Sequence, residues 1–231
     1  MQQLAAGVQR LTPNDYRRMR WKNGRGWTTE LAVHPSDAQL DRQSFDWRVS
    51  VAEVESDAEF SAFPGYDRTL LLAEGGGMEL RFVGAPPQRI AEPYQPLGFR
   101  GEWRTRCRLL NGPVRDFNVM SRRTRFAQRI AILRPADLPL ELVDGGEIRF
   151  VHVFRGALTL SGGTFLPAML VAGDSLRIEK DHAAGKMQLT GDAADTVAAL
   201  MNFAAVTVVT AENPGMRGGG ALPDDPRFPA A

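Results

Sequence analysis

Two stretches of the chain repeat one pattern: TLLLAEG at residues 69–75 followed by MEL at 78–80, and VHVFRG at 151–156 followed by LTL at 158–160. Each copy is an apolar run, a glycine turn and a second short run, which is typical of a β-hairpin. Two copies of this rhythm predict two stacked small antiparallel barrels. Closing a barrel removes the unpaired sheet edges that so many short strands would otherwise expose.

The rest of the chain has the same character, with short alternating runs separated by Gly, Pro and Asp and with little helical periodicity. A single short helix is expected to begin after Thr12, with Pro13 in its first turn, and to end before Trp21. The expected strands are Trp27–Val33, Trp47–Val54, Thr69–Leu72, Met78–Val83, Trp103–Leu109, Phe117–Met120, Ile148–Phe154, Ala157–Leu160, Met169–Val171, Ser175–Ile178, Met187–Leu189 and Val197–Phe203.

The predicted organisation is an N-terminal barrel at residues 1–133, a C-terminal barrel at 134–212 and a flexible tail at 213–231. Pro135, Pro139 and a Gly-Gly pair mark the crossover between the barrels, and Pro, Gly and Asp dominate the tail. The fold class is therefore all-β with few helices.

Composition narrows the class of protein. The formal net charge is only +1, which argues against nucleic acid or an anionic membrane surface as partner. The single cysteine, Cys107, excludes an internal disulfide framework and fits a reducing compartment. Residues 1–10 do not resemble a signal peptide, and no apolar run is long enough to cross a bilayer. A cytoplasmic location is the expectation.

The histidines argue against a metal site. Only His34, His152 and His182 occur, none close to another in sequence, and no Cys-x-x-Cys pair exists. His152 shares a predicted strand face with Phe150 and Phe154, so it is interpreted as a core histidine. His182 lies in a polar turn. The sequence predicts no metal and no cofactor.

Other familiar chemistries are absent or weak. Alternation along residues 103–109 places Cys107 on the face opposite three arginines, so a buried structural thiol is favoured over a reactive one. No phosphate loop and no serine-hydrolase elbow is present. The arginine face formed by Arg104, Arg106 and Arg108 is interpreted as solvated, with a protein-interaction surface as the alternative.

A dense set of polar motifs remains in the first half of the chain. It comprises WKNGRG at 21–26, WRVS at 47–50, FSAFPGYDR at 60–68 and DFNVM at 116–120, followed by Arg123. In order and spacing this set resembles the HutD/Ves family. The second half of the chain matches that family only in barrel rhythm and general length.

The resemblance implies a double-stranded β-helix fold, that is, a cupin-like fold with two barrels (a bicupin) that lacks the standard metal ligands. It also implies a link to bacterial histidine utilisation through binding of a pathway intermediate, with N-formyl-glutamate and urocanate as candidates. No catalytic activity is firmly attached to the family.

The residues themselves suggest a polar pocket. Alternation sends Thr28, Glu30 and Ala32 to one face of their strand, and it separates Arg48 and Ser50 from the apolar residues of the next. A buried arginine must be paired, and Glu30 would pair with Arg48. The planar guanidinium fork matches a carboxylate, so an acidic ligand suits such a site.

The leading hypothesis is a non-enzymatic protein that binds a small acidic metabolite and modulates histidine catabolism. Its rival is a metal-independent enzyme, an isomerase or hydrolase, with Glu30 or Asp116 as the acid–base group. The structural alternative is that these residues form ion pairs at barrel ends. No nucleic acid or membrane partner is expected, and a homodimer is left open. The predicted ligand-binding residues are Asn23, Thr28, Glu30, Arg48, Ser50, Ser61, Phe63, Arg68, Asp116, Asn118 and Arg123.

Overall fold

A computed structural model describes most of the chain. The described residues are 1–21, 24–38, 43–142, 147–163, 166–180, 186–191 and 194–206. They form β-strands joined by turns, with two three-residue 3-10 helices, η1 (Pro13–Asp15) and η2 (Pro135–Asp137). The all-β prediction is confirmed, and every predicted strand is present. The tail predicted at 213–231 lies outside the described residues.

The first unit consists of a wide and a narrow antiparallel sheet. The wide sheet has the order β10 (Leu97–Arg100), β7 (Tyr66–Gly75), β12 (Val114–Arg122), β5 (Trp47–Val54), β4 (Gly26–His34) and β3 (Arg17–Arg20). The narrow sheet has the order β6 (Ala58–Phe60), β11 (Thr105–Leu109), β8 (Met78–Phe82) and β9 (Gln88–Ile90). Apolar side chains of both sheets, among them Val54, Leu72 and Leu80, pack into one core between them.

The second unit repeats this plan. Its wide sheet has the order β1 (Gln2–Ala5), β2 (Val8–Leu11), β18 (Ser175–Glu179), β15 (Ile148–Arg155), β20 (Val197–Ala205) and β13 (Phe126–Leu133). Its narrow sheet has the order β14 (Leu140–Leu142), β19 (Met187–Gly191), β16 (Ala157–Gly162) and β17 (Ala168–Val171). Strands β2 and β13 precede residue 134 in the chain yet pair with β18 and β20 of the second half, and β1 joins the same sheet through β2.

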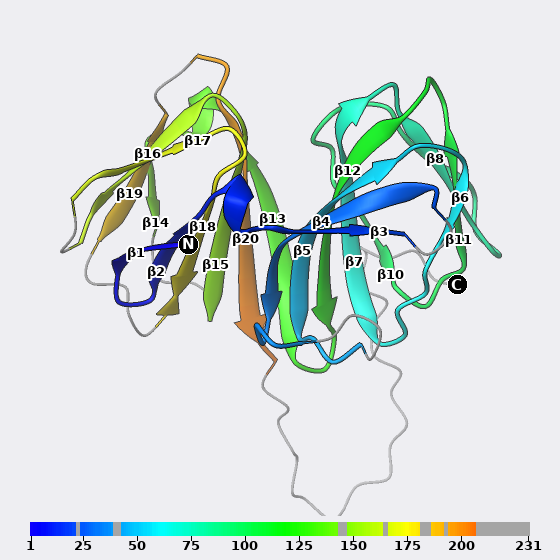
Figure 1. The fold of residues 1–231 in the computed structure, drawn as a ribbon, viewed down its shortest axis with the longest axis horizontal. Coiled ribbons are helices and arrows are strands. Elements are labelled where there is room, and N and C mark those ends of the chain that lie inside the picture. The colour runs from blue at the N-terminus through cyan, green and yellow to red at the C-terminus, as the bar shows by residue number, and fades with distance from the viewer. Residues whose placement is uncertain are drawn as a thin grey trace, which may run out of the picture.

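The two wide sheets face each other, so the molecule has four layers with the narrow sheets outermost (Figure 1). A separate core cluster fills the space between the wide sheets. Trp47 lies at its centre with no exposed surface, and its ring stacks on Phe203 at 4.5 Å between centroids. Apolar burial therefore joins the two units as well as building each of them.

A β-bulge in β4 changes the predicted alternation. The pairing with β5 shifts between Glu30 and Ala32, leaving Leu31 as the extra residue. Thr28 and Glu30 keep the expected face, but Ala32 crosses to the other side and Val33 comes to lie opposite Arg48. One inserted residue inverts all later positions of a strand because the side-chain period is two. The prediction that Ala32 shares the face of Glu30 was wrong.

The predicted N-terminal helix is shorter than expected. Only residues 13–15 are helical, with the Asp15 carboxylate accepting hydrogen bonds from the Thr12 backbone and hydroxyl. Residues 17–20 instead pair with β4 as strand β3, since extension of the sheet satisfies their backbone groups. No helix within the described ranges is long and apolar enough to span a membrane.

Candidate functional site

Three successive rows of side chains cross the inner face of the wide sheet in the first unit, where directly paired residues of antiparallel strands point to the same side. The rows follow from the register of β4, β5, β12 and β7. The first is Arg48, Met120 and Arg68; the second is Glu30, Ser50 and Asn118; the third is Thr28, Ala52 and Asp116. The polarity therefore changes along the strands from basic to acidic.

Arg48 and Glu30 form the ion pair that the sequence predicts. The Arg48 Nε donates to Glu30 Oε2 at 2.6 Å, and Nη1 donates to the Ser50 hydroxyl at 3.3 Å. The Arg48 side chain is only 4% exposed and that of Glu30 is 12% exposed. The pair is thus largely removed from water, and Glu30 is its more accessible member.

Arg68 is the second buried guanidinium of the inner face, and it forms no ion pair with any residue that the structure describes. Its Nη1 donates to the Ser61 carbonyl oxygen at 3.3 Å. Aromatic rings surround it, with Phe99 at 4.9 Å, Phe63 at 5.6 Å and Phe60 at 5.7 Å from the guanidinium carbon. Burial lowers the pKa of Arg68 to about 10, against the opposing field of Asp116, so the group stays cationic at neutral pH.

Several buried polar atoms of this cluster have no hydrogen-bond partner among the described residues. The unmatched donors are Arg48 Nη2 and Arg68 Nε, and the unmatched acceptors are both carboxylate oxygens of Asp116 and the Asn118 amide oxygen. Native interiors leave few such atoms, because each one costs the full desolvation of a polar group. Their concentration on one inner face indicates a place for a polar partner.

Asp116 is fully buried, and burial raises the pKa of its carboxyl to about 7 against the opposing influence of Arg68. The Asp116 carboxyl group therefore gains and loses its proton near neutral pH. The nearby Cys107 thiol is buried too, which raises its pKa to about 12 and confirms the prediction of a structural cysteine.

Asp116 and His152 affect stability in opposite directions below neutral pH. Burial lowers the pKa of His152 to about 3, with a further contribution from Arg115, so the folded histidine stays neutral. Near pH 5, unfolding releases a proton from Asp116 and binds one at His152, and the two contributions cancel. Stability due to His152 is lost as the pH falls below the unfolded value of about 6.5.

Asp116→Asn should reveal the contribution of His152 to the pH dependence of stability, because it removes the opposing contribution of Asp116. We expect the free energy of unfolding of the variant to fall more steeply than that of the wild type, by about 1 kcal/mol per unit as the pH decreases from about 6 to about 4. Urea denaturation across this range measures the slope. Glu74→Gln, which changes an exposed carboxylate on β7, serves as the control and should leave the slope unaltered. Identical slopes for Asp116→Asn and the wild type would contradict the conclusion that Asp116 and His152 affect stability in opposite directions.

Aromatic side chains bridge the two sheets beside the cluster. The Trp21 indole nitrogen donates to the Thr28 hydroxyl on β4 at 2.7 Å, and the Trp21 ring meets Phe60 of β6 edge to face at 6.3 Å. Trp21 and Phe60 are half-buried. They therefore form a wall between solvent and the cluster.

The structure brings most of the predicted ligand-binding residues together, with three exceptions. Arg123 lies apart, paired with Asp67 at 2.8 Å and Glu102 at 3.1 Å, which fits the alternative of a structural ion pair. Ser61 contributes its backbone carbonyl while its side chain is exposed. Asn23 lies outside the described residues.

Sequence reasoning missed Phe99, whose ring is the nearest of the three around Arg68. Residues 97–100 were not recognised as a strand because Gly98 and the Gly101 turn interrupt the apolar run. The pairing of Phe99 directly with Arg68, between β10 and β7, brings the ring to the inner face.

The donor set does not fit a metal ion. Two guanidinium groups lie in the cluster, and neither described histidine reaches it. His152 stacks on Phe117 and His34 on Trp47, both between the wide sheets. His152 is buried and bonded to the Ser175 hydroxyl at 2.9 Å, which confirms it as a core histidine.

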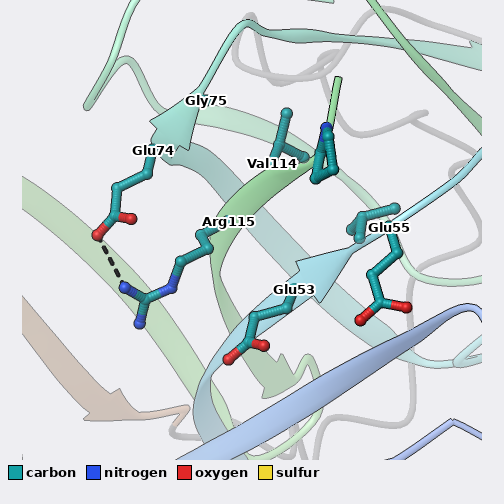
Figure 2. A pocket seen from close by; sticks show the side chains of 8 residues that line it. Glu53, Glu55, Glu74, Gly75, Val114 and Arg115 are labelled. Carbon is teal, nitrogen blue, oxygen red and sulfur yellow. Dashed lines mark hydrogen bonds and ion pairs between the residues drawn. The ribbon is translucent and has the colours of Figure 1, made fainter. Parts of the chain in front are cut away.

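A surface depression of about 440 Å³ lies at the far end of β5, β7 and β12 and is separate from the cluster. Figure 2 shows Arg115 there, paired with Glu74 at 2.8 Å, while Glu53 and Glu55 extend beside it. Ordinary exposed ion pairs line this hollow, and such pairs contribute little to stability or binding. The buried cluster is therefore the stronger candidate for a functional site.

Comparison with known proteins agrees with the motif set. The sequence profile of the HutD family matches residues 13–199, most of the chain. The chain belongs to the HutD family.

A curated relative from Pseudomonas putida, described as an uncharacterized 21.2 kDa protein in the hutC 3′ region, is 40% identical over 123 residues. That match covers 53% of this chain and 63% of the relative. Protein Ves of Cronobacter sakazakii is 34% identical over 113 residues, covering 48% of this chain and 59% of Ves. The chain thus spans less than two thirds of these curated relatives.

Solved structures place the HutD fold among the cupin-like proteins. HutD from Pseudomonas fluorescens SBW25 is 28% identical, with a TM-score of 0.72 over 87% of this chain and 100% of that one. An oxalate decarboxylase from Lactobacillus farciminis is only 8% identical but reaches a TM-score of 0.60 over 86% of this chain and 88% of the enzyme. The second likeness shows the fold alone, and it confirms the cupin-like prediction.

Proposed function

We propose that this HutD protein is a non-enzymatic binding protein for a small carboxylate and that it modulates histidine catabolism. One observation carries the proposal: Arg68 is a buried cation with no ion-pair partner among the described residues, beside the orphaned Nη2 of Arg48. A buried charge without a partner costs several kcal/mol. An anionic ligand would supply the missing partner.

A carboxylate matches the donors that are free. Arg48 and Arg68 flank Met120 from neighbouring strands and face the same interior. Their unmatched N–H groups offer two donors to one anionic group, and guanidinium–carboxylate hydrogen bonds are among the strongest in proteins. Phe60, Phe63 and Phe99 exclude water around Arg68 and so strengthen the interaction.

The link to histidine utilisation comes from the family and from the hutC-region relative. Within that pathway N-formyl-glutamate and urocanate are the candidate ligands, since both are small acids. Binding of an intermediate would let the protein limit flux through the pathway by sequestering it or by signalling its level.

Arg68→Met tests the proposal, because methionine retains an apolar stem in the aromatic surroundings and removes the charge. We expect affinity for the bound acid to fall at least tenfold, about 1.4 kcal/mol, in isothermal titration with N-formyl-glutamate and with urocanate. Arg115→Met, at an exposed ion pair on the same sheet, is the matched control and should bind normally. Equal affinities for Arg68→Met and the wild type would remove Arg68 from the site.

One observation favours a second candidate, a metal-independent enzyme acting on such an acid. Asp116 has a pKa of about 7, near the value that suits a general acid or base at neutral pH. Product analysis on the same samples separates the candidates: turnover that is abolished by Asp116→Asn would favour catalysis, whereas binding without product supports the first proposal.

A further inference from the structure

We propose that the cluster recognises both ends of its ligand. It holds a carboxylate at the row formed by Arg48, Met120 and Arg68 (the arginine row) and an N–H or O–H donor at Asp116. The ligand class is then an elongated monocarboxylate with a hydrogen-bond donor at its far end. Of the two candidate acids, urocanate belongs to this class, and N-formyl-glutamate, a dicarboxylate, does not. This inference rests on the proposed function and deepens it.

The spacing of the rows supports an elongated ligand. Met120, in the arginine row, and Asp116 are four residues apart on β12, and the rows are likewise four residues apart on β5, between Arg48 and Ala52. At about 3.4 Å per residue, the rows are separated by roughly 14 Å between Cα atoms. The arginine side chains shorten this distance, since Arg68 and Asp116 each act on the pKa of the other, and the two ends differ in the chemistry of their free atoms.

The chemistry of the free atoms supports a donor at the far end. The unmatched atoms near the arginine row are donors, Arg48 Nη2 and Arg68 Nε. The unmatched atoms of the other two rows are acceptors, namely both oxygens of Asp116 and the Asn118 amide oxygen. A ligand that accepts hydrogen bonds at one end and donates them at the other satisfies both sets.

A second carboxylate at the far end would be unfavourable. The residues paired directly with Asp116 on the neighbouring strands are Ala52 and Leu72, which carry no charge. The charged or titratable groups that act on Asp116 are Arg68 and the Cys107 thiol, and Cys107 is not ionised at neutral pH. With Arg68 occupied by the first carboxylate, a second one beside Asp116 would lack a counter-charge.

Linear acids of increasing length test the inference when each is compared in three forms: unmodified, with a terminal hydroxyl, and with a terminal carboxyl. At one length in the series, we expect isothermal titration to show the hydroxy acid binding the wild type at least tenfold more tightly than the other two, as a buried hydrogen bond to a charged group implies. In Asp116→Ala this preference should disappear, while the affinity for the unmodified acid stays within about threefold. That retained affinity also reports that the variant is folded.

Glu74→Ala removes an exposed carboxylate from the neighbouring strand and should keep the preference intact. If the acids bind through Arg68 but the three forms bind equally, or if Asp116→Ala keeps the preference, the inference fails and the proposed function stands. If no acid of any form binds the wild type, the proposed function fails and the inference fails with it.

Discussion

Replacing Trp47 with alanine is expected to lower the free energy of unfolding by about 3–5 kcal/mol, the usual cost of truncating a large buried aromatic side chain. Trp47 has no exposed surface and stacks on Phe203 of the opposite wide sheet. It also stacks on His34 at 5.7 Å. Its removal leaves a cavity between the sheets that neither unit can close alone.

Urea denaturation followed by circular dichroism measures this loss. Trp27→Ala is the matched control, because Trp27 is half-buried under Arg18 and Arg20 at the edge of the sheet, and it should cost clearly less. Because the inter-sheet cluster joins the units, the wild type should unfold in one transition. A loss below about 1 kcal/mol for Trp47→Ala would contradict the position of this residue at the centre of the molecule.

Glu30→Leu alone is expected to lower the free energy of unfolding by about 3–5 kcal/mol, because it leaves the buried Arg48 without its carboxylate. Adding Arg48→Met should recover most of the loss, since an apolar pair of similar volume replaces a buried ion pair at little cost. The same denaturation experiment on the two single variants and the double variant gives the coupling between the positions. Additive losses would show that the pair does not act as a unit.

The double variant separates structural from functional roles of the pair. If the ion pair only supports the barrel, Glu30→Leu with Arg48→Met should leave ligand binding untouched. If it belongs to a carboxylate site, the double variant should be stable and yet bind weakly. A double variant that is as stable as the wild type but binds the ligand weakly would therefore show that the pair belongs to the binding site.

The fold could be predicted because strand signals are local. Alternation and turn residues identified every strand of the two repeated hairpins, and glycine turns such as the one at residues 75–77 marked their ends. Partner choice could not be predicted in this way. Strand β2 pairs with β18 across more than half of the chain, with β1 attached to β2, and no local pattern encodes such a distant pairing. Most of the strands that were missed have three or four residues, because alternation needs a longer run to become visible. The eight-residue β13 was missed as well.

The site was partly predictable for the same reason. Alternation placed Glu30, Arg48 and Ser50 on one face, and burial then requires the ion pair that the structure contains. The bulge at Leu31 was invisible in the sequence, because an inserted residue is recognised only against its partner strand. That Arg68 forms no ion pair with a described carboxylate depends on packing between two sheets, so it could be known only from the structure.

Calorimetric titration of the wild type and of the Glu30→Leu, Arg48→Met double variant with N-formyl-glutamate and urocanate is the decisive test of the carboxylate site. We expect the wild type to bind at least one of these acids and the folded double variant to bind it at least tenfold more weakly. Undiminished binding by the double variant, or no binding of either acid by the wild type, would contradict a carboxylate site built on the buried arginines.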